Sequence, residues 1–108
     1  MSAELAGLLR ERVTIQRRGP GRDALGGAVG EWTTIAEAWA AVAPADGGPV
    51  VAGGALAAMP WWRVTLRAPS AAAMGDRMIW RGRRLMTRRI TADPRLPDRV
   101  ECMMEEER

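Results

Sequence analysis

The chain has 108 residues, of which 47% are hydrophobic and 27% charged, and its net charge is +3. This length suggests one domain with a modest core, and no run of about 18 uncharged apolar residues predicts a membrane span. Histidine is absent and Cys102 is the only cysteine, which excludes an internal disulfide and every Ser–His or Cys–His nucleophile pair, and fits synthesis in a cytoplasm.

The N-terminal part of the chain predicts a short helix, a strand and a connection. Leucines recur at helical spacing within residues 2–10. Apolar and polar residues alternate within 11–18, as in a half-buried strand. Residues 18–30 are rich in glycine and predict a flexible connection.

Residues 31–44 have an apolar spacing that fits a helix and a strand alike. We favour a strand for 37–43, because Pro44 and the glycines beyond it end the segment within a short span. Residues 45–60 follow, rich in Gly, Ala and Pro, with Asp46 as their only charge. This stretch is too apolar for an ordinary solvated loop and too rich in glycine for a good helix or strand, so we expect a long inserted loop.

Three further strands are predicted in the C-terminal half. Residues 61–68 alternate cleanly, with Trp62, Val64 and Leu66 facing one way. Residues 76–90 give the strongest local signal, a hairpin whose two strands flank Arg81-Gly82, because Gly82 can adopt the positive φ of a tight turn. One face of this hairpin is lined by Met78, Trp80, Leu85 and Thr87, joined by Ile90 after a one-residue irregularity.

The last predicted strand covers residues 99–104, and Cys102 alternates there with charged neighbours. We therefore interpret Cys102 as a small buried hydrophobe rather than a nucleophile. The tail 105–108 is expected to be exposed. Short strands without a βαβ rhythm favour a mainly β fold: a small antiparallel β-barrel or sandwich with a short N-terminal helix and a long inserted loop.

All sixteen basic residues are arginine, and six of them lie in the predicted hairpin. The candidates for contact with DNA phosphates or with a neighbouring subunit are Arg81, Arg83, Arg84, Arg88 and Arg89. A solvated sheet face is the alternative. No pattern of paired acids, metal ligands or a phosphate loop stands out, so we expect neither an enzyme nor a cofactor or metal site.

A set of motifs recurs in a familiar order along nearly the whole chain. They read "LRERVTIQ", "GEWTTIAEAWAAVAP", "VTLR", "DRMIWRGRRLMTRRI" and "ECMMEE". In this order the chain resembles the bacteriophage head–tail joining proteins, also called head-closure or stopper proteins, of long-tailed phages and phage-like gene transfer agents. It departs from them at Leu85, where the family often has Tyr, and at Thr87, where a β-branched aliphatic residue is usual.

The resemblance implies a single head-closure β-barrel domain over residues 1–108. Such a protein is made in the bacterial host cytoplasm and becomes a structural component of the virion neck. It forms a homo-oligomeric ring, six- or twelve-fold, below the portal and adaptor proteins and above the tail terminator or tail tube proteins. The ring closes the channel for double-stranded DNA after packaging and provides the tail-attachment surface, without a cofactor or a membrane.

By order along the chain, residues 45–60 correspond to the channel-facing loop that acts as the plug in such proteins. The residues implied in this loop are Gly47, Gly48, Val50, Val51, Gly53, Gly54, Leu56 and Met59. Two alternatives stay open. One is a tail-completion or adaptor neck subunit without a plug, and the other is a small basic barrel that binds nucleic acid as a monomer.

Overall fold

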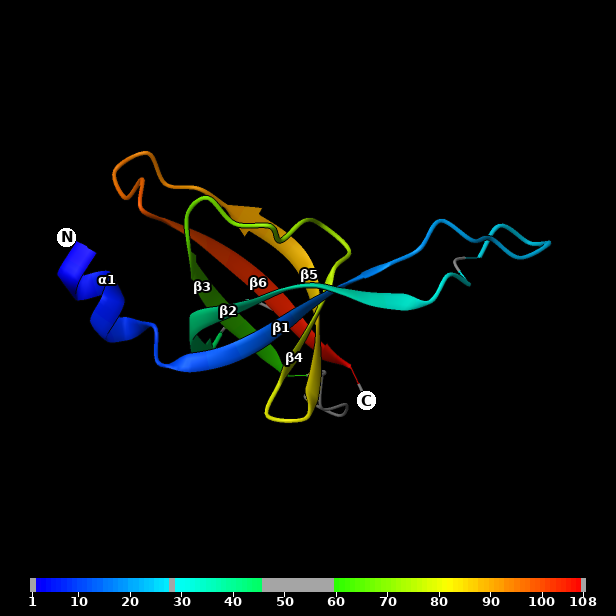
Figure 1. Cartoon of the computed structure of the whole chain (residues 1–108), viewed down its shortest axis with the longest axis horizontal. Coiled ribbons are helices and arrows are strands. Elements are labelled where there is room, and N and C mark those ends of the chain that lie inside the picture. Colours follow the sequence, from blue (N-terminus) through cyan, green and yellow to red (C-terminus); the bar gives the residue numbers. More distant parts are fainter. Residues whose placement is uncertain (1, 28, 46–59, 108) are drawn as a thin grey trace, which may run out of the picture.

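The computed structural model describes residues 2–27, 29–45 and 60–107. Within them it contains one helix and six strands (Figure 1). In chain order these are α1 (Ser2–Leu8), β1 (Glu11–Arg18), β2 (Trp32–Pro44), β3 (Trp61–Arg67), β4 (Arg77–Trp80), β5 (Arg83–Thr91) and β6 (Arg99–Glu107).

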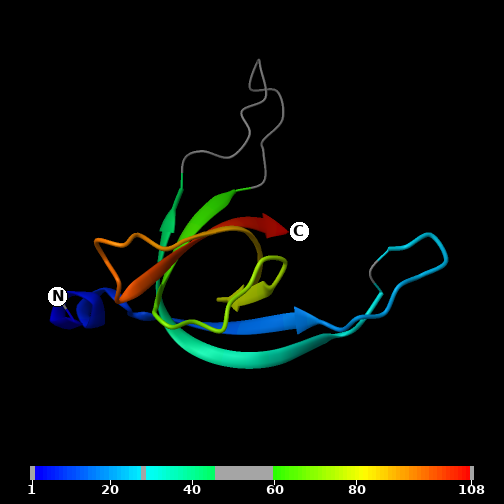
Figure 2. The same ribbon diagram turned by 90° about the horizontal axis from the view of Figure 1, so that it is seen from above.

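The six strands close into a barrel in the order β1-β2-β3-β6-β5-β4, and all neighbouring pairs are antiparallel. Figure 2 shows the curved wall that they make. Closure gives each of these six described strands a hydrogen-bonded neighbour on both sides. This confirms the prediction of a mainly β fold. Of the two predicted architectures, the chain has the barrel and not the sandwich.

The core of the barrel consists of the inward-facing residues of the alternating strands. Its buried members are Val13, Ile15, Ala40, Val64, Leu66, Met78, Trp80, Leu85, Cys102 and Met104. The facing predicted for the strands of residues 61–68, 76–90 and 99–104 is confirmed by this set. Burial also raises the pKa of the Cys102 thiol to about 11, so this cysteine is a core residue, as its sequence context indicated.

The hairpin between β4 and β5 has the predicted turn. Arg81 and Gly82 both have positive φ, 49° and 77°, and Trp80 pairs with Arg83 across the turn. Two successive positive φ values give the twist that a two-residue hairpin needs. The predicted irregularity is also present, as a register shift between Thr87 and Arg89.

Strand β2 is longer than predicted and excludes the helical alternative. It begins at Trp32 rather than near residue 37, because Arg18 of β1 extends the pairing to Trp32. The register shifts between Ile15 and Gln16 of β1, and Ile35 of β2 is exposed. The helix-like spacing of large residues came from this irregularity in an alternating strand.

The prediction of an exposed C-terminal tail is right for Glu107 but not for the two residues before it. Strand β6 continues to Glu107, and Glu105 and Glu106 are only partly exposed. Glu105 forms an ion pair with Arg88, and Glu106 forms one with Arg83. Carboxylates that face arginines on the adjacent strand stabilise the pairing, which is why these charges continue the strand.

The helix α1 ends at Leu8, two residues before the predicted end. Leu5 and Leu9 are buried while Leu8 is exposed. Among the described residues, no helix has the length and apolar character that crossing a membrane requires.

Candidate functional site

The end of the barrel from which residues 45–60 depart is firmly hydrogen bonded. The Ala45 N–H donates to the Trp61 carbonyl at 2.9 Å, and the Glu106 N–H donates to the Pro60 carbonyl at 2.9 Å. Strands β2, β3 and β6 thus hold both ends of the segment. The plug residues named from the sequence, all between 47 and 59, lie outside the described residues.

Two tryptophans close the interior of the barrel at this end. Trp62 of β3 and Trp80 of β4 meet edge to face, with ring centroids 4.9 Å apart. The Trp62 Nε1–H donates to Glu106 Oε1, and the Trp80 Nε1–H donates to Glu11 Oε1, each at 2.8 Å. Indole N–H groups that are buried with a partner fix the ring orientation.

Two hairpin arginines complete this tryptophan cap, which we define as Glu11, Trp62, Trp80, Arg81, Arg83 and Glu106. Arg81 binds both carboxylate oxygens of Glu11, at 2.9 and 3.0 Å. Arg83 binds both oxygens of Glu106 at 3.1 Å, with its guanidinium 5.8 and 5.9 Å from the two indole centroids. The hydrogen bonds from Trp80 and then Arg81 lower the pKa of Glu11 below its usual range.

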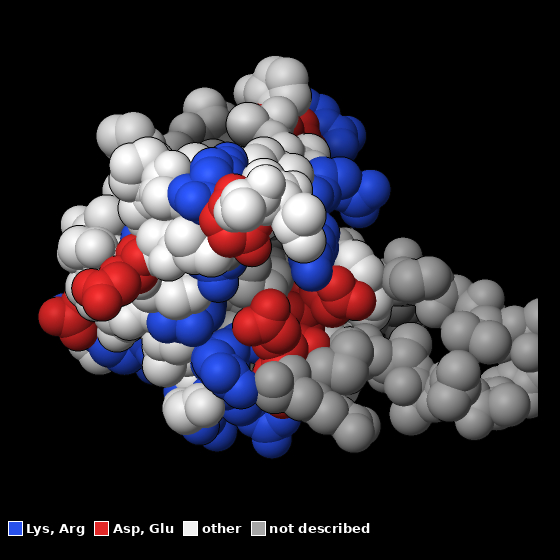
Figure 3. All heavy atoms as spheres, turned by 90° about the vertical axis from the view of Figure 1, so that its right-hand side faces the viewer, with Lys and Arg blue, Asp and Glu red and all other residues white. Residues whose placement is uncertain are grey.

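The five hairpin arginines proposed from the sequence do not form one free basic surface. Arg81 and Arg83 belong to the tryptophan cap, and Arg88 pairs with Glu105 at 3.0 Å. Arg84 and Arg89 are exposed, and neither forms an ion pair with another described residue. On the face drawn in Figure 3, basic and acidic side chains are intermingled.

A second polar cluster joins β1 to the start of β4. Arg17 binds both oxygens of Asp76 at 2.9 Å, and the Asp76 side chain is only 3% exposed. The Ala73 N–H also donates to Asp76, at 2.8 Å. Nothing in the spacing of Arg17 and Asp76 along the sequence indicated this pair, since β1 and the residue just before β4 meet only when the barrel closes.

The segment between β1 and β2 is a projecting arm, which we define as residues 19–31 and which the structure describes except at residue 28 (Figures 1 and 2). Its two sides are joined by backbone hydrogen bonds from Gly19 to Glu31 and from Val29 to Gly21, at 2.9 and 3.0 Å. The prediction of a flexible connection missed this ribbon. The sequence "RDALGG" was its signal, because an aspartate before glycines favours a tight turn.

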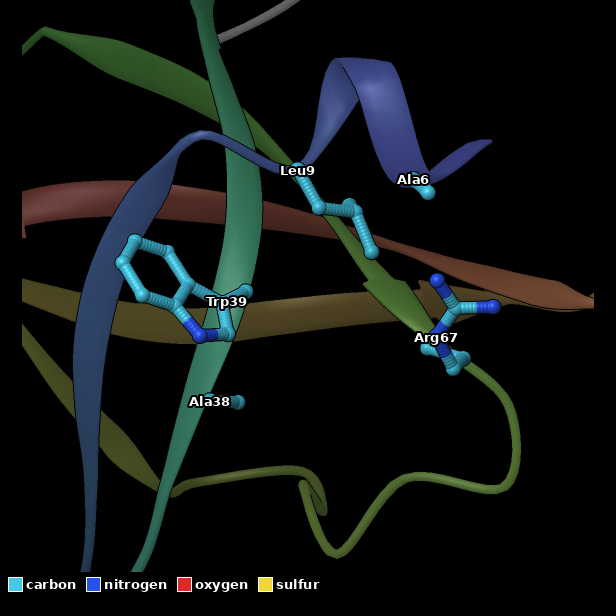
Figure 4. A pocket seen from close by; sticks show the side chains of 5 residues that line it. All are labelled: Ala6, Leu9, Ala38, Trp39 and Arg67. Atoms are coloured by element: carbon cyan, nitrogen blue, oxygen red, sulfur yellow. The ribbon is translucent and has the colours of Figure 1, made fainter. Parts of the chain in front are cut away.

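A groove lies beside α1, next to β2 and the end of β3 (Figure 4). It measures about 460 Å³ and is lined by Ala6, Leu9, Ala38, Trp39 and Arg67. Trp39 is 55% exposed there. The Arg12 guanidinium also contacts its ring, at 5.1 Å from the ring centroid. Nothing in the sequence distinguishes Trp39 from the other large apolar residues of its strand.

The described residues offer no metal centre, since nowhere do three or more Cys, Asp or Glu side chains gather as ligands. What they offer is a rigid barrel with distinct outer features. The chain matches the model of the phage head completion proteins over residues 5–107. The chain belongs to this family.

Two solved structures resemble this phage head completion chain. One is the solution structure of protein SF1141 from Shigella flexneri 2a, with a TM-score of 0.68 and 25% identity, covering 93% of this chain and 94% of the other. The other belongs to the virion of a native gene transfer agent particle, with a TM-score of 0.69 and 20% identity, covering 92% and 96%. No curated protein is significantly similar in sequence.

The family match confirms the resemblance drawn from the sequence. As a phage head completion protein, the chain is a structural component of the head–tail region of a phage-like particle and contacts other proteins of that particle. The family is a structural one and not a class of enzyme. The gene transfer agent structure has the same fold.

Proposed function

We propose that copies of this chain form a ring at the neck of the particle, below the portal and adaptor proteins, and that this ring closes the DNA channel after packaging. The same ring offers the surface to which the tail terminator or tail tube proteins attach. The proposal is supported by the family match, which covers the whole barrel.

The closure role is assigned to residues 45–60, and the observation that carries it is their hydrogen-bonded base. Ala45 and Pro60 are bonded to Trp61 and Glu106 at 2.9 Å, directly beside the tryptophan cap. A segment that leaves a rigid barrel end at two fixed points is aimed by that barrel. Copies related by a ring axis would therefore all aim this segment alike.

The composition of the segment suits a removable seal. Its only charge is Asp46, so it has little electrostatic attraction to DNA phosphates. In a ring, the apolar residues of several copies can pack around the axis, namely Val50, Val51, Leu56 and Met59. Opening then needs only small backbone changes, for which glycines are suitable, namely Gly47, Gly48, Gly53 and Gly54.

DNA contact within the channel falls, in this proposal, to the exposed arginines of β5. Arg84 and Arg89 form no ion pair with described residues, so their charges are available to phosphates or to a neighbouring subunit. Arg81, Arg83 and Arg88 already face carboxylates. Their substitution would disturb the barrel as well as any such contact.

The test is to replace residues 47–58 with a short Gly-Ser link and to measure DNA retention in filled particles. A second variant keeps the full length of the segment and changes four apolar residues to Ser, namely Val50, Val51, Leu56 and Met59. We expect neck rings to persist in both variants while the heads lose DNA, because the barrel is untouched and the apolar seal is gone.

Two results would contradict the proposal in different ways. Heads that retain DNA as well as the unaltered particle would show that the segment is not the seal, and would favour a tail-completion or adaptor subunit without a plug. A chain that is absent from the neck and binds DNA as a monomer, with strong salt dependence, would favour the nucleic-acid-binding barrel.

A further inference from the structure

We propose that the arm of one copy, residues 19–31, inserts its tip into the groove beside α1 of the neighbouring copy. This contact would join copies head to tail, so the inference rests on the proposed ring. The groove is the one lined by Ala6, Leu9, Ala38, Trp39 and Arg67, and its occupant is a second copy of this chain.

The tip of the arm is an ordered turn with a leucine at its apex. Asp23 Oδ1 accepts hydrogen bonds from the N–H groups of Leu25 and Gly27, at 2.9 and 2.7 Å. The Asp23 N–H donates to the Gly27 carbonyl at 2.8 Å, and Gly26 has a positive φ of 85°. The turn thus holds Leu25 in place while leaving its side chain 96% exposed.

The stem of the arm is narrow enough to enter a groove. A Cβ atom on Gly30 would lie 2.2 Å from the carbonyl oxygen of Gly19, and one on Gly21 would lie 3.3 Å from the Gly30 nitrogen. At position 30 only glycine lets the two sides of the ribbon approach so closely, and position 21 has little spare room. The result is a thin ribbon that projects from the barrel (Figures 1 and 2).

The groove has the shape and chemistry to receive such a tip. Its volume of about 460 Å³ is within the range of roughly 300 to 1,000 Å³ that binding pockets span. Leu9 and Trp39 make its apolar wall, and Arg67 lies at the opposite side (Figure 4). The Arg67 guanidinium, exposed and in no ion pair with a described residue, can donate to the backbone carbonyls of an entering turn.

The arm and the groove lie at opposite ends of the molecule, so an arm that enters this groove comes from another copy. Figures 1 and 2 both place α1 at one end of the long axis and residues 19–31 at the other. Contacts between two unlike surfaces of the same chain repeat from copy to copy and close into rings where the rotation allows. If Leu25 of one copy packs against Trp39 of the next copy, both side chains bury surface that is exposed in a single copy.

The first test changes the apex of the arm. Leu25→Asp should leave the thermal unfolding of the unassembled chain unchanged, because the side chain is 96% exposed, and should weaken ring assembly about tenfold or more through loss of a buried leucine. Leu25→Met is the matched control and should assemble like the unaltered chain. Equal assembly of the Asp variant would overturn the arm contact.

The second test identifies what the arm touches in the particle. Leu25→Cys, labelled with a maleimide benzophenone, is irradiated in assembled particles, while the buried Cys102 stays unlabelled. We expect covalent oligomers of this chain whose cross-links map to α1 or β2. Cross-links to a different particle protein would refute the arm contact but would not contradict the proposed ring. Particles whose necks lack a ring of this chain refute the proposed function itself.

Discussion

Trp62 and Trp80 touch edge to face across the interior of the barrel, with their centroids 4.9 Å apart. They come from β3 and β4, which are separated by β6 and β5 in the order of the barrel. Their contact therefore ties opposite walls together at the end where residues 45–60 begin and end.

Truncating one of these rings should weaken the whole barrel. Trp80→Ala should lower the free energy of unfolding by about 4 kcal/mol, since it leaves a large cavity. Trp80→Phe keeps a ring but loses the hydrogen bond to Glu11, and should cost about 1 kcal/mol. Chemical denaturation measures both. Equal losses in the two variants would mean that the ring packing is not what stabilises this end.

The Glu11 carboxylate should make stability depend on pH. Because its pKa is lowered in the folded chain by Trp80 and Arg81, Glu11 stabilises the fold above its ordinary pKa of 4.5, and this contribution is lost as the pH falls through the lowered value. Glu11→Gln should therefore be less stable than the unaltered chain at pH 7, and this gap in stability should shrink as the pH falls below 4.5. A gap that widens in acid would contradict this sign.

The ion pair between Arg17 and Asp76 should be coupled strongly. Arg17→Met leaves the buried Asp76 carboxylate without its cation and should cost about 2 kcal/mol, less than a fully buried pair because Arg17 is 47% exposed. Adding Asp76→Asn should recover part of that loss, since the uncompensated charge is gone. A double-mutant cycle by urea denaturation measures the coupling, and purely additive losses would refute it.

Thr87 is a position where the chain can be stabilised. Its side chain is buried, and its hydroxyl oxygen has no hydrogen-bond partner among the described residues. Thr87→Val removes the unsatisfied hydroxyl at nearly constant shape and should raise the free energy of unfolding by about 1 kcal/mol. The matched change Thr65→Val, on the outer face of β3, should leave it nearly unchanged. A destabilised Thr87→Val would indicate that the hydroxyl has a bonding partner in solution.

The thiol of Cys102 should be inert in the folded chain. It is fully buried, and burial raises its pKa to about 11, so at pH 8 few thiolates form and reagents have no access. Mass spectrometry after iodoacetamide treatment should find no alkylation without denaturant and complete alkylation with it. Rapid labelling of the folded chain would contradict the buried assignment.

The sequence predicted those parts of the fold that depend on local patterns. Alternation identified the inward faces of β3, β5 and β6, and the Gly82 turn was readable because a tight hairpin demands positive φ. The extent of β2 was not readable, because its register shift beside Ile15 disturbs the alternation. The tail was misjudged because the arginines that pair with Glu105 and Glu106 lie on another strand.

The candidate surfaces depended even more on tertiary structure. The groove beside Trp39 is formed by a helix and two strands, and no pattern along the sequence predicts that these elements lie side by side. The hairpin arginines were recognisable as a cluster, but which of them are paired depends on the strands that meet the hairpin, because the partner carboxylates lie on β1 and β6. The projecting arm had a local signal in its aspartate and glycines, which favours a tight turn rather than a flexible connection.

The central claim is that this chain forms the ring that closes the neck of the particle, and an electron cryomicroscopy map of DNA-filled particles tests it most directly. We expect a ring of barrels at the head–tail junction, with residues 45–60 converging on the axis above or around the end of the DNA. A neck that lacks this chain, or a ring whose 45–60 segments point away from an open channel, would contradict it.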